Sequence, residues 1–197
     1  MQQQSFIFTG RSGSGKGTQV ELLSQVLKNK DPNIKQLCIQ EGEEIRQFIQ
    51  GNTNTEKLAK KFYDTGGLFP EFIAVYMWVR ALVERYTGNE HIIFDGTPRK
   101  IREAEVLDSA FEFYGIHKVW VIDIDVTEVE SLRRLLLRKR LDDEESEIKK
   151  RLQWYKTEVL PTIEYFKKNP RYNFIVVDGN REPQDIHADI VKKLGLM

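Results

Sequence analysis

A glycine-rich segment near the N-terminus carries the clearest chemical pattern in the chain. The segment Gly10–Thr18 reads GRSGSGKGT and follows the short apolar run Ser5–Thr9. Glycines let successive backbone N–H groups turn toward phosphate oxygens, at places where a side chain would collide. A helix that begins near Lys16 adds its partial positive charge, and the Lys16 ammonium can reach the β- and γ-phosphates of a nucleotide. The pattern predicts a nucleoside triphosphate site, against the alternative of a glycine-rich β–α turn that holds no ligand.

Two oxygen-bearing side chains could hold Mg²⁺ beside those phosphates. The usual phosphate-loop pattern places Ser or Thr directly after the lysine, whereas here Gly17 intervenes and Thr18 is the candidate ligand. Asp95 comes directly after the apolar run His91–Phe94. An aspartate at the carboxyl end of a central parallel strand, beside a phosphate loop, can hold the ion directly or through water. We therefore expect Mg²⁺ as cofactor, with Thr18 and Asp95 as its protein ligands.

Arginines stand close to these motifs or share a helix face. Arg99 follows Asp95 in the turn DGTPRK, and Arg134 and Arg138 lie four residues apart on one face of a predicted helix. Phosphoryl transfer asks a protein mainly for positioning and for neutralising charge on the equatorial oxygens. Planar guanidinium groups suit that task better than ammonium groups. Taken singly, each arginine could also be an ordinary solvated surface residue.

The elements that must position these residues are short strands alternating with helices. Five runs rich in Ile, Val and Phe are predicted strands: Ser5–Thr9, Lys35–Ile39, His91–Phe94, Lys118–Ile124 and Asn173–Val177. Short, continuous apolar runs are typical of strands covered on both faces. Between them apolar residues recur with helical spacing, as at Val20, Leu23 and Leu27. The alternation predicts an α/β fold with a five-stranded parallel sheet flanked by helices.

Two polar stretches interrupt the alternation. Residues 41–69 are polar and helical in pattern, contain no predicted strand, and lead into the turn-like TGGLFP at 65–70. Residues 138–147 (RKRLDDEESE) are charged or polar apart from one leucine. We interpret the first as a helical insertion on the sheet and the second as a short mobile flap, with a solvated loop before a helix as the alternative. All 197 residues then form one domain.

Composition bounds the class of protein. The 197 residues include 30 Lys+Arg and 30 Asp+Glu, so the formal net charge is zero, which argues against coating nucleic acid or an anionic membrane by bulk attraction. The single cysteine, Cys38, excludes an internal disulfide framework and a cysteine-based zinc site. No apolar run approaches the ~20 residues that span a bilayer, and the start MQQQSFIFTG lacks the basic segment of a signal peptide. We expect a cytoplasmic monomer whose partners are neither nucleic acid nor membrane.

In order along the chain, several segments resemble adenylate kinases and, more broadly, nucleoside monophosphate (NMP) kinases with a short lid. The segments are GxxGxGKGTQ at Gly10–Gln19, EGEEIR at Glu41–Arg46, TGGLFP at 65–70, DGTPRKIREAEVLD at Asp95–Asp108, and RLLLRKRLDD with IKKRLQWY between Arg134 and Tyr155. The resemblance covers nearly the whole chain. It implies a three-layer P-loop NTPase fold with a small NMP-binding insertion, about 41–69, and a lid, about 138–147. It also implies transfer of the γ-phosphoryl group of Mg·ATP to a nucleoside monophosphate, with AMP the family's default acceptor.

The resemblance further implies a role for each matching residue. The catalytic residues would be Lys16, Arg99, Arg140 and Arg151. The ATP-binding residues would be Gly13, Ser14, Gly15, Lys16, Gly17, Thr18, Arg134, Arg138 and Gly179. The acceptor-binding residues would be Glu41, Arg46, Gly67, Leu68, Phe69, Asp95, Gly96, Thr97, Arg99, Glu103, Arg140 and Arg151. Within this set, Arg46 and Arg99 would hold the acceptor's α-phosphate, and Arg140 and Arg151 would bridge the phosphates in flight.

Two positions depart from the family pattern where the acceptor base is read. Adenylate kinases carry a threonine and a glutamine at the places that Glu41 and Glu103 occupy here. Glutamine can donate and accept, whereas an ionised glutamate can only accept, and guanine offers two adjacent donors that one carboxylate can take together. The hypothesis is a GMP or other non-adenine acceptor. The alternative is that one or both glutamates face solvent and AMP binds through shape and phosphate contacts.

The predicted lid is also shortened. Only Lys139 separates Arg138 from Arg140, which is less than in other short-lid members. Poorer exclusion of water could then allow slow ATP hydrolysis. Together with the altered base readers, this supports a second reading, a nucleotide-binding regulatory module with weak turnover. A third reading is a phosphate-loop kinase for another small metabolite, and the match of the acceptor motifs to monophosphate kinases argues against it.

Overall fold

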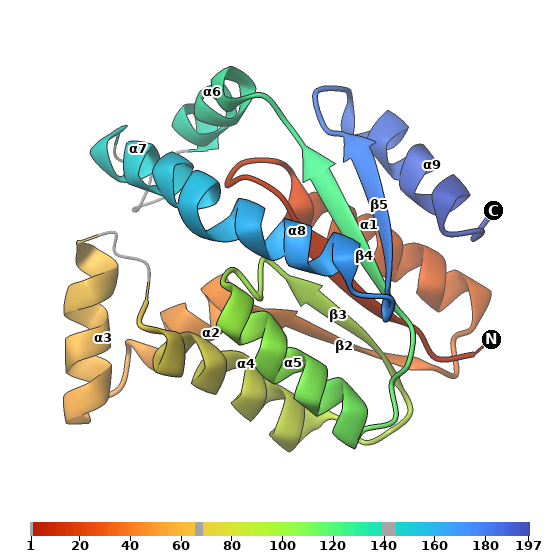
Figure 1. Cartoon of the computed structure of the whole chain (residues 1–197), viewed down its shortest axis with the longest axis horizontal. Coiled ribbons are helices and arrows are strands. Elements are labelled where there is room, and N and C mark those ends of the chain that lie inside the picture. The colour runs from red at the N-terminus through yellow and green to blue at the C-terminus, as the bar shows by residue number, and fades with distance from the viewer. Residues whose placement is uncertain (1, 66–68, 139–144) are drawn as a thin grey trace.

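Five parallel strands form the centre of the molecule. The computed structural model describes residues 2–65, 69–138 and 145–197 (Figure 1). The strands are ordered β2–β3–β1–β4–β5, and every neighbouring pair is parallel. Their bounds are Ser5–Thr9 (β1), Lys35–Gln40 (β2), Glu90–Asp95 (β3), Val119–Asp125 (β4) and Tyr172–Asp178 (β5). All five predicted strands are confirmed, each within one residue at either end.

Helices cover both faces of the sheet, so the fold has three layers (Figure 1). One face carries α1 (Lys16–Lys30) and α9 (Pro183–Lys193), and the other carries α4 (Glu71–Arg85), α5 (Ile101–Phe113) and α8 (Leu160–Lys168). Successive side chains of a strand point to opposite faces. Accordingly Phe6 and Phe8 pack with α1 and α9, whereas Ile7 packs with α4, α5 and α8. The predicted three-layer α/β architecture is therefore confirmed.

The other helices gather where the strands end. They are α2 (Glu41–Phe48), α3 (Asn54–Asp64), α6 (Glu128–Arg138) and α7 (Glu145–Trp154). In Figure 1 they lie on the side toward which the strand arrows point. α7 continues through a π-helical turn, Tyr155–Val159, into α8. The carboxyl edge of an open α/β sheet is where such folds bind ligands, so these helices frame the candidate site.

The predicted helical stretch 41–69 contains α2 and α3, and within its described residues no strand occurs. α3 starts with a capping box in which the Thr53 hydroxyl accepts the Glu56 N–H and the Glu56 carboxylate accepts the Thr53 N–H. Most of the predicted flap, residues 139–144, lies outside the described residues. Across the part of the chain that the structure describes, no helix is both long and apolar enough to cross a membrane.

Candidate active site

The phosphate loop joins β1 to α1 and is pressed against its neighbours. Gly13 and Gly15 have positive φ angles of 78° and 95°, which L side chains rarely adopt. A Cβ at Gly13 would lie 2.9 Å from Leu135 Cγ. The Ser131 hydroxyl donates to the Ser12 carbonyl at 2.6 Å, which fastens the loop to α6. The loop therefore has its shape before any ligand arrives.

The ammonium of Lys16 lies over this loop. Lys16 Nζ donates to the carbonyl oxygens of Gly10, at 2.9 Å, and Arg11, at 2.8 Å. Burial lowers the pKa of Lys16 to about 8, although the neighbouring Asp95 carboxylate acts in the opposite direction. Its hydrogen-bond partners are neutral carbonyls, so a polyphosphate that replaced them would bring negative charge into direct contact with the ammonium.

The predicted acceptor turn meets the phosphate loop at Lys16. A Cβ on Gly96 would lie 3.7 Å from Lys16 Cε. The charges of Asp95, Arg99 and Arg138 are all close enough to shift the pKa of Lys16. The turn after β3 and the end of α6 are far from the loop in sequence, and the fold brings both to it.

The candidate magnesium ligands lie on one side of that meeting point. Asp95 Oδ2 would lie 3.6 Å from a Cβ on Gly17, so this carboxylate faces the first turn of α1. Thr18 is in the same turn and is exposed. Mg²⁺ prefers oxygen ligands and usually keeps water while binding one or two carboxylates and substrate phosphates. A carboxylate and a hydroxyl beside a phosphate loop fit an ion of that kind.

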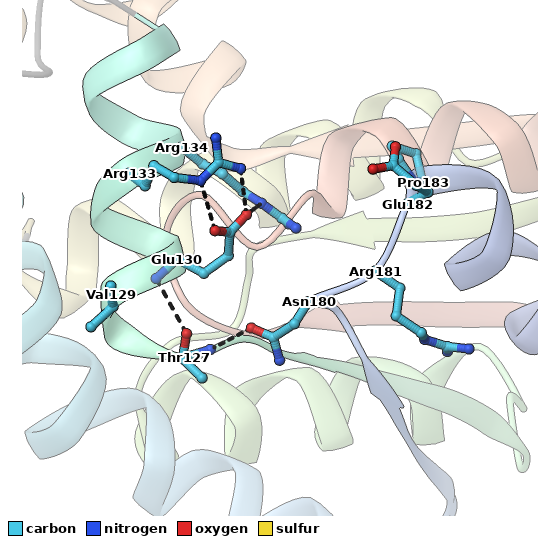
Figure 2. Close-up of a pocket in the computed structure, with 9 residues that line it drawn as sticks. All are labelled: Thr127, Val129, Glu130, Arg133, Arg134, Asn180, Arg181, Glu182 and Pro183. Carbon is cyan, nitrogen blue, oxygen red and sulfur yellow. Dashed lines mark hydrogen bonds and ion pairs between the residues drawn. The ribbon is translucent and has the colours of Figure 1, made fainter.

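A hollow of about 670 Å³ lies between α6 and the segment that joins β5 to α9 (Figure 2). Its lining residues are Thr127, Val129, Glu130, Arg133, Arg134, Asn180, Arg181, Glu182 and Pro183. The Arg134 guanidinium donates to Gly179 O at 2.8 Å and to Glu130 at 2.6 Å, and it reaches Ser14 O of the phosphate loop at 3.4 Å. It thus forms a flat wall on which a nucleobase could stack.

Glu130 lines this hollow, and the sequence reasoning did not single it out. Its carboxylate accepts from both Arg133 and Arg134, as Figure 2 shows. These hydrogen bonds lower the pKa of Glu130 to about 2. The sequence did hold a signal. Glu130 precedes Arg133 by three residues and Arg134 by four, and residues with these spacings are neighbours on the surface of a helix. Glu130 holds Arg134 in place beside Gly179.

On the acceptor side, the predicted phosphate-binding arginines contact carboxylates. Arg46 lies 2.8 Å from Glu43 Oε2, and both side chains are partly exposed. Arg99 Nε donates to Gly96 O at 2.8 Å and lies 3.0 Å from Glu41 Oε2. Both predicted phosphate-binding cations are thus paired with carboxylates of the protein itself.

The two glutamates that depart from the family pattern are both buried. Glu41 is 2% exposed and Glu103 is 1% exposed. Glu103 Oε2 accepts the backbone N–H of Arg99 at 2.9 Å. Burial, and then the charge of Glu41, raise the pKa of Glu103 to about 7, and burial also raises the pKa of Glu41 against the opposing effect of Arg99. The alternative that one or both face solvent is therefore wrong, because packing encloses both side chains.

Three further predicted site residues have side chains that are buried or partly buried. The Phe69 side chain is buried in a cluster with Ile45 and Met77, and its carbonyl accepts from Lys100 Nζ at 3.4 Å. Thr97 is buried. Arg151 is partly buried on α7. Gly67, Leu68 and Arg140 lie outside the described residues.

A second residue that the sequence reasoning missed pairs with the last residue of β1, just before the phosphate loop. Asp123 is 6% exposed, and burial raises its pKa to about 6 while the charges of Lys16 and Arg11 act against that rise. Arg11 itself lies 4.2 Å over the Tyr155 ring and donates to Val126 O at 2.9 Å. The only sequence signal was an acid within an apolar strand. The buried charges around Lys16 thus include one that no motif contains.

Comparison with known proteins adds independent information. The sequence profile of the adenylate kinase family matches residues 8–171. A protein named adenylate kinase from Bacteroides fragilis is 33% identical over 192 residues, covering 95% of this chain and 96% of the relative. An adenylate kinase from Thermus thermophilus is 30% identical over 197 residues, with 98% of each chain covered. A third, from Azobacteroides pseudotrichonymphae, is 31% identical over 189 residues, with 94% of each covered.

Proposed function

Because this chain belongs to the adenylate kinase family, we propose that it transfers the γ-phosphoryl group of Mg·ATP to AMP. It is a phosphotransferase of the nucleoside monophosphate kinase type. The observation that carries the proposal is the contact between donor and acceptor elements, where a Cβ on Gly96 would lie 3.7 Å from Lys16 Cε. The two elements are therefore close enough to hold the two reacting phosphates side by side, as an in-line transfer requires.

The donor would bind along the phosphate loop and in the hollow beside α6. Backbone N–H groups of residues 13–18 would cradle the phosphates, and the base would stack on Arg134 near Gly179. Lys16 would exchange its two carbonyl partners for phosphate oxygens. Thr18 and Asp95 would hold magnesium, directly or through water, and the ion would supply charge neutralisation to the phosphates. Arg138, whose charge already acts on Lys16, would meet the same phosphates.

The acceptor would bind between α2 and the turn after β3. Arg46 and Arg99 would hold its α-phosphate, leaving one oxygen free to attack the γ-phosphorus while the bond to the β-phosphate oxygen of ATP breaks. Arg151, and Arg140 from outside the described residues, would neutralise charge on the moving group. Residues 41–69 would act as the acceptor-binding insertion and residues 138–147 as the lid of a single domain that spans the chain.

Two features of Glu103 support AMP over GMP. Its Oε2 already accepts the Arg99 N–H, so taking both donors of guanine would compete with that hydrogen bond. Its pKa of about 7 leaves the protonated form well populated near neutral pH. A protonated carboxyl presents one donor and one acceptor, the same pair that the amide of glutamine offers to adenine. GMP is the second candidate, and the ionised form of the same buried carboxyl group favours it.

An acceptor panel tests this proposal. Initial rates with AMP, GMP, CMP, UMP and dTMP at fixed Mg·ATP should show AMP ahead by at least about tenfold, since an unmatched buried polar group costs about 1–3 kcal/mol. Equal or faster turnover of GMP would overturn the AMP assignment. Tight ATP binding without transfer to any monophosphate would instead favour the regulatory module. Turnover of a non-nucleotide acceptor alone would favour the other metabolite kinase.

A further inference from the structure

Two buried carboxyl groups contact the same arginine, Arg99, on the acceptor side. Glu41, at the start of α2, and Glu103, in the first turn of α5, are 2% and 1% exposed. Arg99 contacts Glu41 through its side chain and Glu103 through its backbone N–H. An ion taken out of water is tolerated only when it is well paired. One cation cannot pair fully with two carboxylates. If both glutamates were ionised, one buried negative charge of this cluster would therefore lack a matching cation.

The hydrogen bonds indicate that the pairing is incomplete. Arg99 Nε directs its hydrogen to Gly96 O at 2.8 Å. Glu41 Oε2 is 3.0 Å from the same nitrogen, yet it is buried and accepts no hydrogen bond from any described residue. Glu41 thus gains attraction to the cation without the directed bond that would satisfy its oxygen.

The other charges around the pair do not remove this shortage. Lys100 is the second cation that acts on both carboxyl groups, but its ammonium donates to Phe69 O and gives neither carboxylate a hydrogen bond. The negative charge of Asp95 near Glu41 acts against the charge of Lys100. Burial is the largest cause of the raised pKa of each glutamate, and the charge of Glu41 is the second cause for Glu103. Two carboxyl groups with these surroundings favour binding a proton between them.

We propose that Glu41 and Glu103 share one proton and act as a positioning pair for Arg99, so that binding of the acceptor's phosphate is coupled to protonation of the pair. With the proton bound, the pair carries one negative charge, matched by Arg99. An acceptor phosphate that takes Arg99 then leaves one buried carboxylate unmatched. Without the proton, the same phosphate leaves two. This inference rests on the proposed function, because it assumes that a nucleoside monophosphate binds at Arg99.

The coupling has a defined sign. A phosphate dianion beside the pair increases the affinity of the pair for its proton. Above about pH 7, where the free pair is losing that proton, binding must therefore take the proton up from solution. By linkage, uptake of one proton weakens the observed affinity tenfold for each unit of rising pH. The acceptor's own phosphate, with a second pKa of about 6, stays a dianion from pH 7.5 to 8.5.

Calorimetry of AMP binding to the full chain, without ATP, measures this coupling. At pH 8, titrations in buffers of different ionisation enthalpy should give an uptake close to one proton per AMP bound. The dissociation constant should rise nearly tenfold between pH 7.5 and 8.5. If the acceptor panel selects another monophosphate, that compound replaces AMP.

Glu103→Gln is the informative variant, because the amide is neutral at every pH and can still accept the Arg99 N–H. Its proton uptake should be smaller than that of the wild type by close to one proton per AMP, and its dissociation constant should rise much less across the same pH range. Lys16 also titrates near pH 8, but it is present in both proteins, so the difference between them isolates the pair. Glu112→Gln, an exposed glutamate of the same helix α5, should behave as wild type.

Two results would overturn the coupling: AMP binding to the wild type with no proton uptake, or the same uptake in Glu103→Gln. Glu41→Gln gives the same test if the first variant does not fold, as judged by its circular dichroism and melting curve. The proposed function fails separately, through absence of turnover at pH 7. Turnover without proton uptake would refute only the coupling, and uptake without turnover would refute only the kinase reaction.

Discussion

The donor and acceptor sides of this molecule hold their phosphate-binding cations in different ways. On the donor side, the Lys16 ammonium donates to two neutral carbonyls of its own loop. On the acceptor side, Arg99 and Arg46 lie against the carboxylates of Glu41 and Glu43. Both sides must receive an anion, but Lys16 donates to neutral groups, whereas Arg99 and Arg46 each lie within 3.0 Å of a carboxylate oxygen.

That difference determines what an incoming phosphate must displace. A carbonyl that loses its donor remains neutral, whereas a carboxylate that loses its cation is left as an unmatched charge. The two acceptor arginines differ in the solvent exposure of the carboxylates that they contact. Glu43 is 48% exposed and water can solvate it after Arg46 leaves, while Glu41 is 2% exposed and water cannot. We expect the donor side to bind with little electrostatic rearrangement and the acceptor side to respond to charge at Glu41 and Glu103.

The largest effect is expected from removing the donor-side charge. Lys16→Met should lower the phosphoryl-transfer rate about 10³-fold, the scale for losing one preorganised donor to transition-state charge. Steady-state kinetics with Mg·ATP and AMP measures it. Lys28→Met, an exposed lysine of the same helix α1, is the matched control and should keep the wild-type rate. An unchanged rate in Lys16→Met would contradict the role of the phosphate loop.

An intermediate effect is expected for Arg99, and it should appear in the binding of the acceptor but not in the binding of ATP. Arg99→Lys keeps the charge but loses the planar fork, and a charge-assisted hydrogen bond of about 1.5–3 kcal/mol corresponds to a rise of about 10–100-fold in KM for AMP. KM for ATP should change by less than about twofold. Arg102→Lys, whose side chain is 80% exposed, serves as control. If KM for ATP rose as much as KM for AMP, Arg99 would serve both nucleotides and the contrast between the sides would disappear.

The third effect is on stability rather than on catalysis, and it concerns the rigidity of the donor loop. Gly13→Ala combines a positive φ with a Cβ 2.9 Å from Leu135 Cγ, and should lower the free energy of unfolding by about 3 kcal/mol. Gly88→Ala has a similar φ with nothing within 4 Å, and should lower it by only about 1 kcal/mol. Urea unfolding compares the two variants. Equal losses would show that the loop yields to the added methyl group, and that its shape is not fixed by packing on α6.

The sequence alone determined the fold and the donor loop, because both depend on neighbours in the chain. Five apolar runs predicted five strands, since burial on both faces leaves continuous Ile, Val and Phe. The phosphate loop could be predicted because its glycines, its lysine and the following helix act within nine consecutive residues, Gly10–Thr18. The roles of the individual arginines stay predictions that the kinetic experiments above test.

Only the tertiary structure decided which charges are buried together. The order β2–β3–β1 puts the turn after β3 beside the phosphate loop, and so brings Gly96 to Lys16. Nothing local in the sequence marks Glu41 and Glu103 as enclosed, and Asp123 belongs to no motif. Whether water reaches a carboxyl group depends on segments that are distant in the chain and pack over it, and water access sets whether that group keeps its charge.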